Sequence, residues 1–176
     1  EEIERVIKEV KDLIEELRRN TERTLRESEE LLKTLKKISD DSKEEVERML
    51  RELRELVKSN KEAKEEIRKV ADRIRKVIKR LMDENKKVAD EIRKRDEDLL
   101  DENRKLIDRI RREIDKKIRS KEDADRLRRE VDKLLEESKR LSEETKRELD
   151  RILEETKRTL ERLKEELDKI LEEVER

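Results

Sequence analysis

The chain has 176 residues, 61% of them charged and 30% hydrophobic, and contains no Gly, Pro, Cys, His or aromatic residue. Because 53 basic residues nearly cancel 54 acidic ones, no net field draws the chain to nucleic acid or to a membrane. The missing Gly and Pro exclude a mainly β fold. The missing His and Cys exclude thiol chemistry and the usual catalytic and transition-metal sites.

The residues that remain are helix formers. A charged fraction this high usually indicates disorder, but here the polar residues are mostly Glu, Lys and Arg and the apolar ones mostly Leu and Ile. These types favour helices, and with helical spacing of the apolar positions they are typical of long-helix and coiled-coil proteins. We therefore expect an all-α protein.

The first third of the chain carries apolar residues at steps of three and four, from Ile3 to Val57. That spacing predicts one helical stripe. Residues in the stripe recur in kind eighteen positions later, as Leu13 does at Leu31. Eighteen residues make five whole turns at about 3.6 residues per turn, so the pattern predicts nearly straight helices with little supercoil.

Two breaks divide the chain into three helices of similar length. Residues 59–62 and 120–123 each fit a capping box, and Asn60 tolerates a left-handed C-terminal conformation. The predicted helices are 2–58, 61–118 and 121–175, and similar lengths suit antiparallel neighbours in one bundle. A rival capping box at residues 42–45 would give four unequal helices, but the eighteen-residue repeat continues through it.

Polar residues interrupt the stripes at matching intervals. In the middle third, the ten-residue segments 81–90 and 99–108 repeat in character at every position. The same step of eighteen relates the polar pairs Thr21 and Ser39, Thr24 and Ser42, Asn85 and Asn103, and Ser138 and Thr156.

These polar positions are predicted to converge on two heights of the bundle. With turns centred near residues 60 and 120, Thr21, Asn103 and Ser138 fall within a turn of one another. Ser39, Asn85 and Thr156 do the same about 27 Å away, at 1.5 Å per residue.

We interpret the two heights as buried hydrogen-bond layers. An unpaired buried polar group costs about 1–3 kcal/mol, so such layers tolerate only the register that pairs them. Asn85 and Asn103 are expected to be buried. For the Ser and Thr residues an alternative stays open, in which they are solvated and bond to their own helix backbone. Asp96 could join the layer around Thr21, but we expect it at a solvated edge.

Charge placement favours the order up-down-up. Residues 1–60 carry a net charge of −3, residues 61–120 carry +6 and residues 121–176 carry −4. A positive middle helix between two negative ones places opposite charges side by side where it contacts each neighbouring helix. The alternative reading of the middle segment as a nucleic-acid patch is disfavoured by its 16 interleaved acids and by the absence of aromatics.

We expect no catalytic, cofactor-binding or metal-binding residues, and no cofactor. Carboxylate pairs such as Glu15 and Glu16 lie on solvated faces without a pocket. No partner, nucleic acid or membrane is expected, and a monomer is favoured. A homo-oligomer is the alternative if adjacent residues such as Leu99 and Leu100 point to two different faces of the helix, and a filament-type coiled coil is a third reading.

No targeting signal or membrane span is evident, which suits a soluble protein from cytoplasmic expression. Because the chain begins at Glu1 rather than Met, we expect that a leader or tag was removed.

Taken together, the Glu/Lys/Arg surface, Leu/Ile core, eighteen-residue repeat, capping boxes and Asn/Ser/Thr layers resemble a computationally designed, parametrically generated three-helix bundle. The resemblance covers the whole chain, although many such designs have Gly at their turns. It implies a stable scaffold without catalytic activity. The predicted fold is an all-α, single-chain antiparallel three-helix bundle (up-down-up), forming one domain over residues 1–176.

Overall fold

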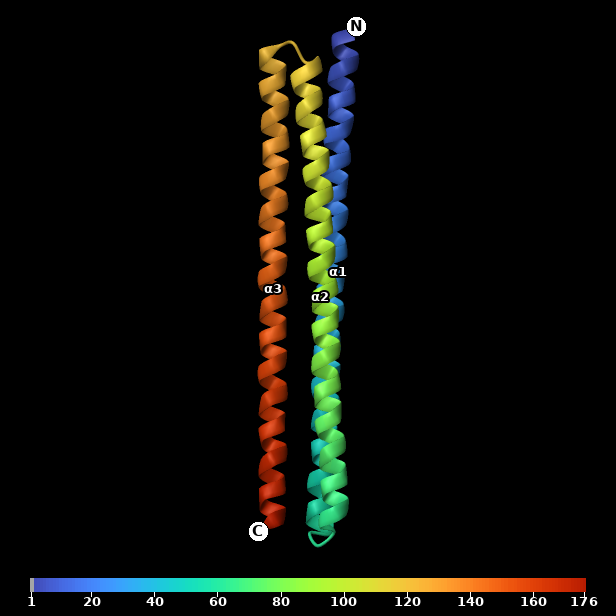
Figure 1. The fold of residues 1–176 in the computed structure, drawn as a ribbon, viewed down its shortest axis with the longest axis vertical. Helices are drawn as coiled ribbons and strands as arrows, with labels where there is room; N and C mark the ends of the chain where they lie inside the picture. The colour runs from blue at the N-terminus through green and yellow to red at the C-terminus, as the bar shows by residue number, and fades with distance from the viewer. Residues whose placement is uncertain (1) are drawn as a thin grey trace. The chain divides into compact units, whose positions relative to one another are not determined.

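The protein is a three-helix bundle, as the sequence predicted. The computed structural model describes residues 2–176 and consists of α1 (Glu2–Ser59), α2 (Lys64–Lys117) and α3 (Lys121–Glu175), shown in Figure 1. The described part of the chain contains no strand. Because α1 is continuous through Ser42 and α2 through Asn85, the four-helix alternative is wrong.

Contacts group the chain into two compact units, and each unit contains a segment of every helix. Unit 1 comprises Glu1–Leu31 and Ile92–Arg147, and unit 2 comprises Leu32–Glu91 and Glu148–Arg176. Within unit 1, the start of α1 lies at the same end as the turn between α2 and α3 (Figure 1). Within unit 2, the end of α3 lies at the same end as the turn between α1 and α2 (Figure 1). The single domain over residues 1–176 stays a prediction.

Each unit has its own apolar core. In unit 1, Leu17 of α1, Ile110 of α2 and Leu127 of α3 are fully buried in one cluster. Burying a side chain of this size stabilises the fold by about 1.5–3 kcal/mol. The amphipathic stripes supply these residues, since positions three and four apart share one face of a helix.

The core of unit 2 repeats that of unit 1 at a distance of thirty-six residues, twice the eighteen-residue step. Its central residues are again a leucine on α1, an isoleucine on α2 and a leucine on α3, and all three are buried. They are Leu53, Ile74 and Leu163.

Ion pairs between helices show the same correspondence and fix the chain directions. Between α1 and α3, Arg18 pairs with Glu130 at 3.3 Å in unit 1, and Arg54 pairs with Glu166 at 3.0 Å in unit 2. Both pairs span 112 residues, so α1 and α3 have the same register within each unit.

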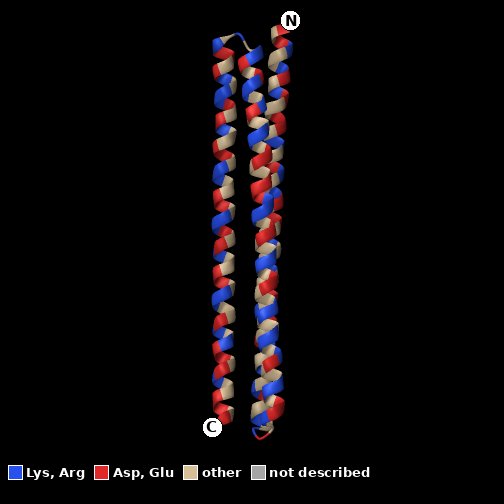
Figure 2. Ribbon diagram, viewed as in Figure 1, with Lys and Arg blue, Asp and Glu red and all other residues tan. Residues whose placement is uncertain are grey.

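The α2 and α3 helices run antiparallel. In unit 1, Arg111 pairs with Asp132 at 3.1 Å and Asp115 pairs with Arg128 at 2.6 Å, so the numbers rise along α2 as they fall along α3. Bases and acids are interleaved along all three helices (Figure 2). Each exposed pair contributes only about 0.2–1 kcal/mol, so these contacts bias the register more than they stabilise the fold.

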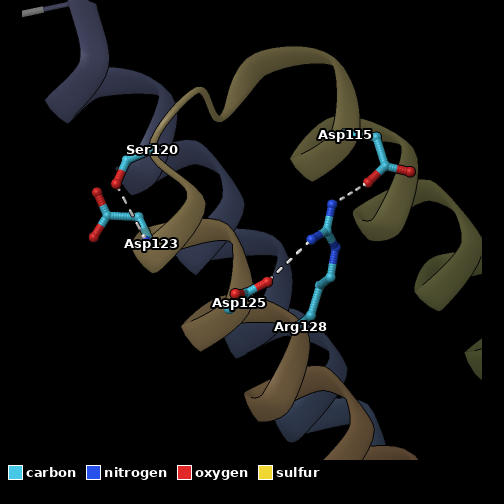
Figure 3. Close-up of polar contacts among 5 residues, drawn as sticks. All are labelled: Asp115, Ser120, Asp123, Asp125 and Arg128. Carbon is cyan, nitrogen blue, oxygen red and sulfur yellow. Dashed lines mark hydrogen bonds and ion pairs between the residues drawn. The ribbon is translucent and has the colours of Figure 1, made fainter.

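The capping box predicted at residues 120–123 is present on its serine side. The Ser120 hydroxyl accepts a hydrogen bond from the Asp123 backbone N–H at 3.4 Å, which satisfies one of the free donors at the start of α3 (Figure 3). One turn further on, Arg128 reaches both Asp125 on its own helix and Asp115 on α2. These contacts cap the start of α3 and pair its second turn with the end of α2.

The capping box predicted at residues 59–62 is wrong. Ser59 belongs to α1, and its hydroxyl donates to the Leu56 carbonyl at 3.2 Å, so it serves the end of α1 and not the start of α2. The α2 helix begins at Lys64, where the Ala63 carbonyl accepts the first helical hydrogen bond. The predicted left-handed conformation of Asn60 is also wrong, because no residue in the described part of the chain has a positive φ. Its N–H still bonds to the Leu56 carbonyl at 2.9 Å, which holds it in a right-handed turn.

Candidate functional site

A small polar cavity lies inside unit 1, at the level that the sequence assigned to the first layer. It is lined by residues from all three helices, is partly open to the surface, and has a volume of about 20 Å³. Thr21, Asn103 and Ser138, which were predicted to share one height, all line it. The buried polar residues around it are Thr21, Ser28, Asp96, Asn103, Ser142 and Thr145.

Asn103 makes the contact between helices that the layer hypothesis requires. Its side chain is 4% exposed, which confirms the predicted burial, and its Nδ2 donates to the Ser138 hydroxyl of α3 at 3.5 Å. Its Oδ1 is buried without a hydrogen-bond partner. Only one side of the amide is therefore paired.

Asp96 makes the shorter contact between helices. The residue is 6% exposed, and its Oδ2 accepts a hydrogen bond from the Ser142 hydroxyl at 2.7 Å. The expectation that Asp96 is solvated at the edge of the stripe is wrong. It lies seven residues before Asn103, and that spacing of two turns places both side chains on the same inner face of α2.

The second set of polar residues, in unit 2, is buried but poorly paired. Asn85 is 2% exposed, so its predicted burial is confirmed, yet both its Oδ1 and its Nδ2 lack hydrogen-bond partners. The Ser39 hydroxyl is likewise buried and unpaired. Asn85 and Thr156 line one groove, and Ser39 and Thr156 line another. The three residues gather as predicted, but they do not form a network.

Several hydroxyls follow the alternative reading and bond to their own helix. Thr21 donates to the Leu17 carbonyl at 2.9 Å, Ser42 to Ile38 at 2.7 Å and Thr156 to Ile152 at 2.8 Å. The same bond to the carbonyl four residues back is made by Thr24 and Thr159. A hydroxyl that donates to its own helix can still accept, so these residues present lone pairs to the interior.

Altered pKa values occur at exposed ion pairs on the surface of the helices. The hydrogen bond from Lys117 at 2.9 Å lowers the pKa of Glu113, and the same contact raises the pKa of Lys117. The hydrogen bond to Asp115 raises the pKa of Arg128, and the one to Glu148 raises the pKa of Arg151. These groups lie on the surface, where solvent screens them, so the shifts indicate ion pairs and not an active site.

The described residues offer little further chemistry. Among them there is no group of three or more His, Cys, Asp or Glu residues placed to hold a metal ion. Glu15, one of the carboxylates considered in the sequence, forms an exposed pair with Arg18 at 2.9 Å. The search of the described helices for an apolar stretch long enough to cross a membrane found none.

Sequence reasoning missed the role of Ser142. The residue is buried at 7% exposure and supplies the hydrogen bond to Asp96. A signal was available in the spacing, since residues 138, 142 and 145 follow steps of four and three along one face of α3. Leu141, beside Ser142, is only half-buried.

Comparisons with known proteins give little further identification. No protein-family model matches the chain, and no curated protein matches it. Among solved structures, the chain is similar to one titled "Computationally designed three helix bundle", with 13% sequence identity and a TM-score of 0.44. The match covers 98% of this chain and 81% of that one.

Proposed function

We propose that the chain is a designed, monomeric structural scaffold with no natural catalytic role. The observation that carries the proposal is the surface of the bundle. Of the large hydrophobic side chains in the described residues, only Ile3 is exposed, at 63%. Stable interfaces have an apolar, well-packed centre, and one exposed isoleucine near a chain end does not supply it.

The repetition of the sequence supports a designed origin. Apolar core residues and ion pairs recur at multiples of eighteen residues, with the same residue types at equivalent positions, as in the pairs Arg18–Glu130 and Arg54–Glu166. The chain achieves this without Gly, Pro or an aromatic residue. Such agreement of local propensity, periodicity and charge placement is the aim of idealised design.

Light scattering across a wide range of protein concentration tests the monomeric scaffold. The expected mass is 21.6 kDa at every concentration. A mass that rises with concentration would contradict the proposal and favour the alternative, a helical assembly module. The variant Ile3→Glu is the matched control, because it removes the one exposed large hydrophobic side chain of the described residues without touching the core. If the mass still rises in that variant, the association uses another face.

A further inference from the structure

The cavity in unit 1 has room for a single small occupant. A site needs roughly 10–15 Å³ of such space to hold one water molecule, and this cavity offers about 20 Å³. Monovalent cations such as potassium and ammonium are close to water in size.

Four leucines line part of the cavity, and its polar part offers hydrogen-bond acceptors. The hydroxyl protons of Thr21 and Thr24 are donated to carbonyls of their own helix. Ser142 donates its proton to Asp96, and Asn103 donates from Nδ2 to Ser138. The hydroxyl oxygens of Thr21, Thr24 and Ser142 therefore still offer lone pairs to an occupant. An occupant that carries positive charge or donates hydrogen bonds suits such a lining, and an anion does not.

The carboxylate of Asp96 favours a cation over a water molecule. Asp96 is the one ionisable side chain among the buried residues of the described chain, and none of those residues is a lysine or arginine. A buried charge is costly unless it is paired or coordinates a metal ion. Ser142 supplies one hydrogen bond but no charge. A cation would supply the missing charge.

The position of Asp96 is also a departure from the repeat. The residue eighteen positions before it, Ile78, is buried in the apolar core of unit 2. Ser142 departs in the same way, because Leu160 takes the equivalent position in unit 2 and is buried there. The repeat alone would have given an apolar core at this level, so the polar cluster is a local exception that concentrates oxygen atoms around one carboxylate.

We propose that the Asp96 end of this cavity is a binding site for one monovalent cation of about the size of water, either potassium or ammonium. The carboxylate and the neighbouring Ser142 and Thr145 hydroxyls hold it, in keeping with the preference of hard cations for oxygen ligands. Asn103 lies about 10 Å further along α2 at 1.5 Å per residue, so it belongs to the opposite end of the cavity. The site is independent of the scaffold role and can fail without affecting it.

Urea unfolding of the full chain in different chloride salts tests the site. Urea is preferred because guanidinium is itself a monovalent cation. At equal ionic strength, potassium or ammonium chloride should raise the urea midpoint above that in choline chloride, whose cation is too large for the cavity. A ligand that binds only the folded state at about ten times its dissociation constant raises the folding equilibrium constant roughly tenfold.

Two variants separate the site from general salt effects. Asp96→Asn keeps the shape of the side chain but removes its charge, so the difference between potassium and choline should disappear. Asp98→Asn makes the same charge change at an exposed position of α2, so it should keep the wild-type difference. Equal midpoints in all salts, or an unchanged difference in Asp96→Asn, would overturn the proposal and leave a water molecule as the occupant.

A crystal grown in rubidium chloride gives a direct readout that does not depend on unfolding. Rubidium resembles potassium and scatters anomalously, so a peak is expected beside Asp96. Its absence from a well-ordered cavity would also overturn the proposal.

Discussion

Replacing Asn85 with leucine should stabilise the protein. Both polar atoms of its amide are buried without hydrogen-bond partners, and the residue is 2% exposed. An unsatisfied buried polar group costs about 1–3 kcal/mol, and leucine of similar volume removes that cost and adds apolar burial. We expect the free energy of unfolding to rise by about 1–3 kcal/mol in Asn85→Leu. Chemical denaturation followed by far-UV circular dichroism measures the change.

Asn103→Leu is the matched comparison, because it makes the same substitution at the repeat-related position. Here the amide pairs with Ser138, so the variant removes one hydrogen bond and leaves that hydroxyl without its donor. A typical net hydrogen bond is worth about 0.5–1.5 kcal/mol, so the gain should be smaller than in Asn85→Leu by about that amount. A loss of more than about 1 kcal/mol in Asn85→Leu would refute the reasoning, since it would mean that the amide is satisfied in solution.

Three further predictions concern the core, a cap and a surface pair. Leu53→Ala should lower the free energy of unfolding by about 2–5 kcal/mol in chemical denaturation, because the side chain is fully buried in the core of unit 2 and leaves a cavity. Ser120→Ala should cost about 0.5–2 kcal/mol in the same assay, since it removes the acceptor for the Asp123 N–H, whereas Ser59→Ala should have a smaller effect. The pKa of Glu113 is lowered by Lys117, so the pair stabilises the fold above the unfolded carboxyl pKa of about 4.3 and loses this contribution as the pH falls below it. Stability measured from neutral to acid pH should therefore fall less steeply in Glu113→Gln, and an identical slope would contradict the assignment.

The sequence predicted the helices and their pairing because these features depend on local periodicity. Three long helices follow from apolar residues at steps of three and four, and the burial of Asn85 and Asn103 follows from their places in those stripes. The start of α3 was also predictable, because residues 120–123 fit a capping box. In it the Ser120 hydroxyl accepts a hydrogen bond from the Asp123 N–H. These features depend only on the local sequence, namely on the helix face that a residue occupies and on the residue type at a helix start.

The features that were missed depend on contacts between helices. The hydrogen bond that Asp96 accepts comes from Ser142, forty-six residues away, so the sequence around Asp96 does not show the partner that accompanies its burial. The turn after α1 was mispredicted for a related reason. Ser59 could serve either the helix before it or the helix after it, and the sequence does not show which carbonyl or N–H lies within reach.

The two units differ most where the repeat is broken. Four buried polar positions of unit 1 have buried apolar residues eighteen positions away in unit 2, so equal helices could have been packed with an apolar core throughout. The pairs are Ser28 with Val46, Asp96 with Ile78, Ser142 with Leu160, and Thr145 with Leu163. A polar core is less stabilising than an apolar one of equal volume. A slip of one helix past another would leave the Asp96 carboxylate without its Ser142 donor, so we propose that these residues favour one register. In unit 1 the polar residues make hydrogen bonds between helices, whereas in unit 2 Asn85 is buried without a hydrogen-bond partner.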